Sequence, residues 1–180
     1  IPAHNEEAGL AAVLRDLAPL AGRLGAPVEI LVIDDGSTDR TAEVARAAGA
    51  AVLRHAVNLG YGAALKRGVR AAQQEWVAIL DADGTYPIED LERLLREADA
   101  YDMLVGARQG EVYRGGVGKG VLRVIFRGLC TYVTGVRVPD PNSGCRVFRT
   151  ALARRYLDTL SKGYSFTTSI TMVFLLEGHA

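Results

Sequence analysis

Two aspartates separated by one alanine are the most informative residues of the sequence. Asp81, Ala82 and Asp83 directly follow an apolar run at residues 76–80 that predicts a buried strand. Two carboxylates spaced in this way can face one hard cation, and Mg²⁺ or Mn²⁺ held by them keeps open positions for phosphate oxygens. Such an ion neutralises the charge that builds up on a departing nucleotide. The alternative is a pair of solvated aspartates that cap the helix predicted to begin near Pro87.

A second acidic cluster, at residues 34–39 (DDGSTD), follows an apolar run at residues 28–33. A carboxylate at a strand end, such as that of Asp35, can accept hydrogen bonds from ribose hydroxyls or from a base N–H. The alternative is a strand-to-helix turn without a ligand, in which Gly36 permits the turn and a hydroxyl side chain caps the next helix.

Polar residues near the start of the chain can bind the same kind of ligand. His4 can stack on a base, and Glu6 can accept a hydrogen bond from its ring N–H or from ribose. The alternative is a capped helix with acidic side chains in its first turn, where the helix dipole favours them. The residue types alone leave both interpretations open.

The elements that must position these groups alternate between strands and helices. We expect strands at residues 28–33, 51–53, 76–80 and 103–105, and helices near residues 6–24, 39–48, 61–74 and 87–98. Asn5 is expected to cap the first helix, Pro19 to kink or divide it, and Gly25 to end it. Strands of near-continuous apolar character imply a sheet covered on both faces, with ligands at the carboxyl ends of its strands.

Two glycine-containing segments carry weaker signals. Residues 58–64 (NLGYGAA) lack the lysine–serine pair of a P-loop and the complete GxGxxG of a dinucleotide fold. Close packing of a helix against the sheet is therefore the favoured role for this segment. Residues 109–120 predict a mobile loop over the ligand-binding edge of the sheet.

A basic amphipathic helix is predicted at residues 117–134. Lys119, Arg123 and Arg127 recur every four residues, and apolar side chains supply much of the remaining surface. Such a helix can rest on an anionic membrane surface with its cationic groups near lipid phosphates. The alternative is an ordinary helix packed on the sheet with a solvated basic face.

Composition bounds the class of protein. The 180 residues suffice for one domain, and 21 basic against 21 acidic residues give no net charge, which argues against a dedicated nucleic-acid binder. The two cysteines form no CxxC pair, so a reduced, cytoplasmic chain is expected. No apolar run is long enough to cross a bilayer. The first residue is not methionine, and the last residues directly follow an apolar stretch. We therefore expect residues 1–180 to be a single-domain fragment that lacks a first strand and a C-terminal continuation.

Taken together, six motifs resemble glycosyltransferase family 2: PAHNE (2–6), DDGSTD (34–39), NLGYGAALKRG (58–68), DADGTYP (81–87), GAR (106–108) and DPNSGCRVFR (140–149). Their order is most similar to the polyprenyl-phosphate sugar transferases of the dolichyl-phosphate mannose synthase type. The resemblance implies the GT-A fold, a Rossmann-like α/β/α sandwich with a mostly parallel, mixed central sheet. It also implies sugar transfer with inversion, from a GDP- or UDP-sugar to dolichyl or undecaprenyl phosphate, at the inner face of the cell membrane.

The resemblance assigns roles to particular residues. The nucleoside would be held by Pro2, His4, Glu6, Ile33 and Asp35. Asp81 and Asp83 would bind Mg²⁺ or Mn²⁺, Ala82 would lie against the donor, and Arg108 would meet a phosphate. Thr85 stands where relatives commonly have glutamine or serine, which puts a third metal ligand in doubt, and His4 stands where many have tyrosine.

On the acceptor side, Asp140 is the candidate catalytic residue. It would serve as general base for a hydroxyl acceptor, or would orient the acceptor or a nearby cation if the acceptor is a phosphate that needs no strong base. The alternative is that Asp140, between Pro139 and Pro141, only shapes a turn. Arg123 is the candidate for binding the acceptor phosphate, and Arg146 would support the nearby loop or a phosphate. Two alternatives remain: transfer to a sugar hydroxyl in polysaccharide or cell-wall glycan synthesis, and a non-catalytic nucleotide-sugar-binding module.

Overall fold

The computed structural model describes residues 1–108 and 117–179, with only the backbone of residues 117–123. Its strands are β1 (Pro2–Ala3), β2 (Leu31–Asp34), β3 (Ala51–Arg54), β4 (Trp76–Ile79), β5 (Met103–Val105) and β6 (Arg146–Arg149). Its helices are α1 (Glu7–Leu17), α2 (Leu20–Leu24), α3 (Thr41–Ala47), α4 (Tyr61–Ala71), α5 (Ile88–Arg96), η1 (Ala98–Ala100), α6 (Val117–Thr134), α7 (Thr150–Tyr156) and α8 (Phe166–Leu176).

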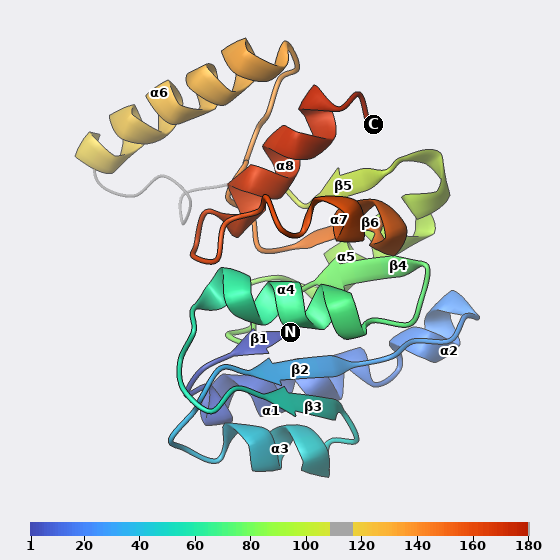
Figure 1. Cartoon of the computed structure of the whole chain (residues 1–180). Coiled ribbons are helices and arrows are strands. Elements are labelled where there is room, and N and C mark those ends of the chain that lie inside the picture. Colours follow the sequence, from blue (N-terminus) through green and yellow to red (C-terminus); the bar gives the residue numbers. More distant parts are fainter. Residues whose placement is uncertain (109–116, 180) are drawn as a thin grey trace.

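The strands form two three-stranded sheets (Figure 1). In the first, the order is β1-β2-β3 and all pairs are parallel, with Ile33 opposite both Pro2 and Leu53. In the second, the order is β4-β6-β5 and the central strand β6 runs antiparallel to both neighbours. The α/β class with parallel and antiparallel pairs is as expected, although the single central sheet is divided. Residues of both β2 and β4 line a mainly apolar cavity of about 640 Å³.

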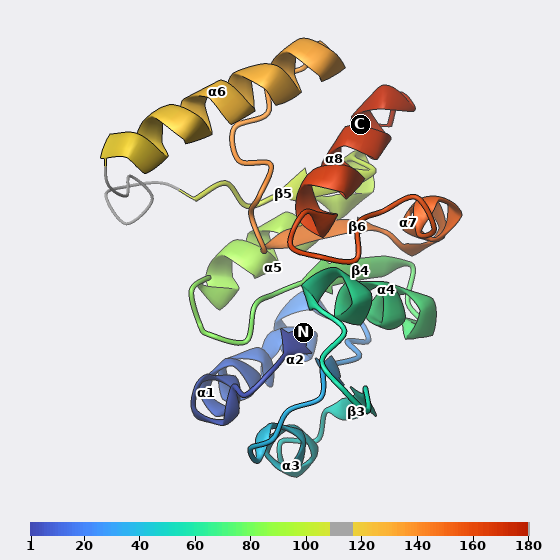
Figure 2. The ribbon, with the colours of Figure 1, turned by 60° about the vertical axis from the view of Figure 1, so that its left-hand side comes forward.

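Helices cover both faces of the second sheet. Successive side chains of β6 pack against opposite layers, because side chains of a strand alternate between its two faces. Val147 packs with Leu17 of α1 and Leu91 of α5. Phe148 packs on the other face with Val69 of α4 and Phe174 of α8. Figure 2 shows these helices on either side of the strands. The result is the three-layer sandwich that the near-continuous apolar strands predict.

The first helical region is divided as expected but begins differently. Pro19 separates α1 from α2, and Gly25 ends α2 in the left-handed region with φ 63°. The prediction that Asn5 caps the helix is wrong, because the N-cap residue is Glu6 and no side chain caps α1. Asn5 itself has φ 56°, and its side-chain oxygen accepts a hydrogen bond from the backbone N–H of Thr38. Asn5 therefore joins the first loop to the second acidic cluster.

Helix α6 lies on the outside of the molecule beside α8, away from both sheets (Figures 1 and 2). This position contradicts the alternative of an ordinary helix packed on a sheet. Of the segment predicted as a loop, residues 109–116 lie outside the described residues. Residues 117–120 belong to α6, so the loop prediction is wrong for them.

Candidate functional site

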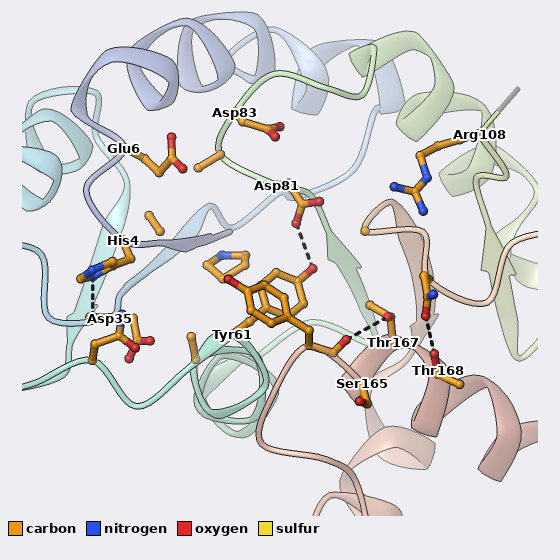
Figure 3. Close-up of a pocket in the computed structure, with 18 of the residues that line it drawn as sticks. His4, Glu6, Asp35, Tyr61, Asp81, Asp83, Arg108, Ser165, Thr167 and Thr168 are labelled. Atoms are coloured by element: carbon orange, nitrogen blue, oxygen red, sulfur yellow. Dashed lines mark hydrogen bonds between the residues drawn. The ribbon is translucent and has the colours of Figure 1, made fainter. Parts of the chain in front are cut away.

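A cavity of about 870 Å³ opens beyond the carboxyl ends of β1, β2 and β4. This volume suits a ligand of the size of a nucleotide sugar. The cavity is lined by eight residues for which the sequence predicts a role: Pro2, His4, Glu6, Asp35, Asp81, Ala82, Asp83 and Arg108. Figure 3 shows that the labelled members of this set come from separate loops and surround one space.

Asp81 and Asp83 lie in the turn that follows β4. Asp81 is partly buried, and its removal from solvent raises the pKa of its carboxyl. Its Oδ1 accepts a hydrogen bond from the Tyr61 hydroxyl at 2.9 Å, and Asp83 Oδ1 accepts one from Thr85 N at 2.9 Å. Neither aspartate caps α5, whose N-cap is Pro87 and lacks a side-chain cap. The alternative reading of the pair as helix caps is therefore wrong.

The residues around Asp81 fit a hard divalent cation. Gly144 packs so closely that a Cβ there would lie 2.0 Å from Asp81 Oδ2, so the backbone forms a cradle around the carboxylate. Within residues 1–108 and 124–179, no cluster of three or more His, Cys, Asp or Glu side chains could hold a metal. An ion would thus take these two carboxylates and complete its shell with substrate oxygens and water, as Mg²⁺ commonly does.

Asp35 forms the opposite side of the cavity. Its Oδ1 accepts hydrogen bonds from His55 Nδ1 at 2.6 Å and Leu59 N at 2.9 Å, and its Oδ2 accepts one from Gly60 N at 2.8 Å. Burial opposes ionisation of this carboxyl, but these donors outweigh it and lower the pKa of Asp35. His4 Nδ1 donates to the Asp35 carbonyl at 2.9 Å. An ionised Asp35 only accepts hydrogen bonds, so it selects a ligand with an N–H or O–H donor.

Asp140 is the partner of Arg108 and does not line the cavity. The Arg108 guanidinium donates from Nε to Asp140 Oδ2 at 2.9 Å and from Nη2 to Oδ1 at 3.2 Å. Asp140 is only 3% exposed, whereas Arg108 faces the cavity. Asp140 therefore lies behind the cavity wall, and its role toward an acceptor stays a prediction. Its carboxylate holds Arg108 at the cavity wall.

Two other predicted residues, Ile33 and Arg146, also lie away from the cavity. Ile33 is 2% exposed in β2, behind Pro2, and does not line it. Arg146 is fully buried, and its guanidinium donates to the carbonyls of Pro141, Ser143 and Thr167 and to Thr171 Oγ1. Burial lowers the pKa of Arg146 to about 10. Of its two predicted roles, the structure gives Arg146 the support of the loop. The side chain of Arg123 lies outside the described residues.

The cavity also contains residues that the sequence did not single out. Tyr61, Asn58 and Gly144 line it, and so do Phe126 from α6 and Tyr164 from the loop before α8. Ser165, Thr167 and Thr168, from the hydroxyl-rich segment before and within α8, line it as well. The sequence allows two roles for this segment, hydrogen bonding to a sugar or phosphate and an ordinary helix. Tyr61 belongs to the segment at residues 58–64, which the sequence analysis interprets as packing of a helix against the sheet. No neighbouring residue in the sequence indicates a role for its side chain.

Comparison with known proteins agrees with the family that the sequence motifs resemble. A sequence model of glycosyl transferase family 2 matches residues 1–159. The undecaprenyl-phosphate 4-deoxy-4-formamido-L-arabinose transferase of Pseudomonas aeruginosa is 35% identical over 168 residues, which cover 87% of this chain and 48% of that protein. The dolichyl-phosphate hexose transferase of Haloferax volcanii is 34% identical over 158 residues, covering 83% and 64%. This chain thus spans about half to two thirds of the length of these relatives.

A solved structure shares the fold and shows a bound metal. The glucosyl-3-phosphoglycerate synthase of Mycobacterium tuberculosis, in complex with Mn²⁺, uridine diphosphate and phosphoglyceric acid, matches with a TM-score of 0.75 at 26% identity. The match covers 98% of this chain and 63% of that one. The GT-A fold expected from the motifs is confirmed. In the part of the chain that the structure describes, no helix is both long and apolar enough to cross a membrane.

Proposed function

Because the chain belongs to glycosyl transferase family 2, we propose that it transfers a sugar, with inversion, from a nucleoside diphosphate to a polyprenyl phosphate. One observation carries this proposal: Asp35, Asp81, Asp83 and Arg108 line a single cavity at the ends of the strands. Asp35 can hold a nucleoside, Asp81 and Asp83 can hold a metal ion that binds the diphosphate, and Arg108 can attract a phosphate oxygen. Whether the base is guanine or uracil depends on contacts beyond the Asp35 carboxylate, which accepts from either.

Different residues of the chain are assigned to the metal ion, the donor sugar and the phosphate. Asp81 and Asp83 would hold Mg²⁺ or Mn²⁺, and Ala82 between them would leave room for the donor. Such an ion, when bound, would supply positive charge against the negative charge that develops on the diphosphate as the sugar departs. Arg108, held at the cavity wall by Asp140, places its positive charge beside the diphosphate. A polyprenyl phosphate is already ionised near neutral pH, so its oxygen attacks the anomeric carbon without a strong base.

The acceptor assignment is supported by the relatives and by α6. Both curated relatives are named for transfer to a polyprenyl phosphate. The described part of α6 contributes Phe126 to the cavity wall and exposes five apolar side chains to solvent: Val124, Ile125, Leu129, Tyr132 and Val133. An exposed apolar surface of this kind favours docking to a membrane, at its cytoplasmic face in this proposal. One helix would then join the cavity to the lipid surface.

The test is a transfer assay with the full-length protein. Radiolabelled UDP- and GDP-sugars are incubated with Mn²⁺ and undecaprenyl phosphate, and the label that enters the organic phase is counted. We expect transfer with one donor, none to undecaprenol lacking the phosphate, and none with Asp81→Ala or Asp83→Ala. Label that never reaches the lipid, or transfer that survives both alanine variants, would refute the proposal.

A second candidate, transfer to a hydroxyl acceptor, is favoured by the solved neighbour that carries phosphoglyceric acid. Asp140→Asn distinguishes the two acceptors. If Asp140 were the base for a hydroxyl, its loss would lower kcat by roughly 10²–10⁴-fold. If it only holds Arg108, as the ion pair favours, asparagine keeps an acceptor oxygen for that guanidinium, and we expect about a tenfold rise in the donor KM or less, with kcat nearly unchanged. The measurement is steady-state kinetics with each acceptor.

A further inference from the structure

The segment at residues 58–61 connects the two acidic sides of the cavity. The backbone N–H groups of Leu59 and Gly60 donate to the Asp35 carboxylate at 2.9 and 2.8 Å. The next residue, Tyr61, donates its hydroxyl proton to Asp81 Oδ1 at 2.9 Å (Figure 3). Gly60 has φ 97°, a conformation that glycine adopts readily, and it lets the chain turn from one contact to the other.

The Tyr61 ring is held in place from two directions. The ring of Tyr164 stacks on it, with centroids 5.8 Å apart and planes 17° apart. Directly behind it, Gly62 packs against the backbone of residues 161–163, where a Cβ would lie 2.6 Å from Ser161 O. Ala63 N also donates to the Lys162 carbonyl at 2.9 Å. The start of α4 is therefore fixed against this loop, and the hydroxyl is directed at Asp81.

A fixed donor to one oxygen of a carboxylate limits the rotation of that carboxylate. Gly144 closes on the other oxygen of Asp81, so contacts lie on both sides of the group. Outer-shell hydrogen bonds of this kind orient metal ligands, and their loss commonly weakens metal binding about 10–100-fold. Tyr61 differs from the ligands themselves because it acts through Asp81.

We propose that Tyr61 is the positioning residue of the metal ligand Asp81, and that residues 58–61 thereby set the nucleoside-binding and metal-binding groups relative to each other. This inference rests on the proposed metal-assisted transfer. It predicts that removal of the Tyr61 hydroxyl weakens the metal site while the nucleoside site is preserved, because the donors to Asp35 in this segment are backbone N–H groups.

The experiment compares the full-length wild type with Tyr61→Phe, which removes one oxygen atom. Tyr101→Phe is the matched control, because Tyr101 is half-exposed and does not line the cavity. Mn²⁺ binding is titrated by electron paramagnetic resonance, and UDP binding is titrated calorimetrically in EDTA. For Tyr61→Phe we expect a Kd for Mn²⁺ that is about 10–100-fold higher and an unchanged Kd for UDP in EDTA. Tyr101→Phe is expected to match the wild type in both.

The outcomes separate this inference from the proposed function. Equal Mn²⁺ affinity in Tyr61→Phe and wild type overturns the positioning role alone. A parallel loss of metal-free UDP affinity also overturns it, because Tyr61 would then support the whole cavity and not Asp81. A wild type that binds no Mn²⁺, with or without UDP, overturns the proposed metal-assisted transfer and this inference together.

Discussion

Replacing Gly144 by alanine is expected to remove most of the transfer activity at a small cost in folding stability. A Cβ at this position would lie 2.0 Å from Asp81 Oδ2, 2.7 Å from Cγ and 2.9 Å from Oδ1. Such separations below 3.0 Å essentially never occur, so the nearest oxygen must move by at least 3.0 − 2.0 = 1.0 Å. The group that moves is a side-chain carboxylate and not a strand, so the backbone can stay in place.

The size of the effect follows from that displacement. A misplacement of about 1 Å in a reacting site can cost on the order of 10²-fold in rate, which equals about 2.7 kcal/mol of transition-state stabilisation. Overpacking usually costs about 1–3 kcal/mol in folding, and a carboxylate that can swing aside favours the lower end. We therefore expect kcat/KM to fall about 100-fold and the free energy of unfolding to fall by about 1 kcal/mol.

The assay measures kcat/KM for the donor at saturating acceptor, Mn²⁺ affinity, and unfolding in urea. Gly22→Ala is the matched control, because a Cβ at that position in α2 would meet no atom of the described structure within 4 Å. It is expected to keep full activity and to gain about 0.5–1 kcal/mol of stability, as alanine does over glycine in helices. Activity of Gly144→Ala within about twofold of the control would refute the reasoning. So would a loss of folding stability above about 3 kcal/mol, because the backbone would then be what gives way.

Three further predictions concern groups outside the metal ligands. His55→Leu removes a donor to Asp35 and is expected to weaken UDP binding about 3–10-fold by calorimetry, whereas His55→Asn, which retains an N–H donor, should recover most of it. The pKa of Asp35 is lowered by folding, so its stabilisation is present above the ordinary value of 3.8 and is lost as the pH falls through the lowered value. Urea unfolding of wild type and Asp35→Asn should therefore differ more at pH 7 than at pH 3. Arg146→Met leaves buried carbonyls without donors, and we expect a loss of about 3 kcal/mol or more in unfolding free energy.

Sequence patterns located the residues of the site that follow strand ends. Asp81 comes directly after an apolar run and Asp35 follows another such run with one residue in between, and the carboxyl ends of parallel strands meet at one edge of a sheet. That local rule sufficed to place both groups in one cavity. The burial of Ile33 could also have been read from its apolar strand, and only the family resemblance suggested a ligand contact for it.

The remaining contacts join residues that are far apart in the chain. The pair Arg108–Asp140 spans 32 residues, and the bond from Tyr61 to Asp81 spans 20. No periodicity reports such pairings, because they depend on how complete elements pack. Strand β6 was missed for a related reason: it has only two apolar residues, and it begins with the buried Arg146. This strand forms because it pairs with β4 on one side and with β5 on the other.

Because the strands form two separate sheets, strand pairing does not fix the distance between Asp35 and Asp81. Asp35 follows a strand of the first sheet and Asp81 follows a strand of the second, and no backbone ladder connects the two sheets in the described structure. Their separation therefore depends on contacts at the cavity mouth: the bonds of residues 58–61, and the approach of Gly9, where a Cβ would lie 2.8 Å from Ala82 O. In a continuous sheet, strand pairing alone would fix this distance. Here the loop before α4 and the start of α1 must fix it, so small changes at Gly9 or Tyr61 should disturb the donor site more than equal changes within the strands.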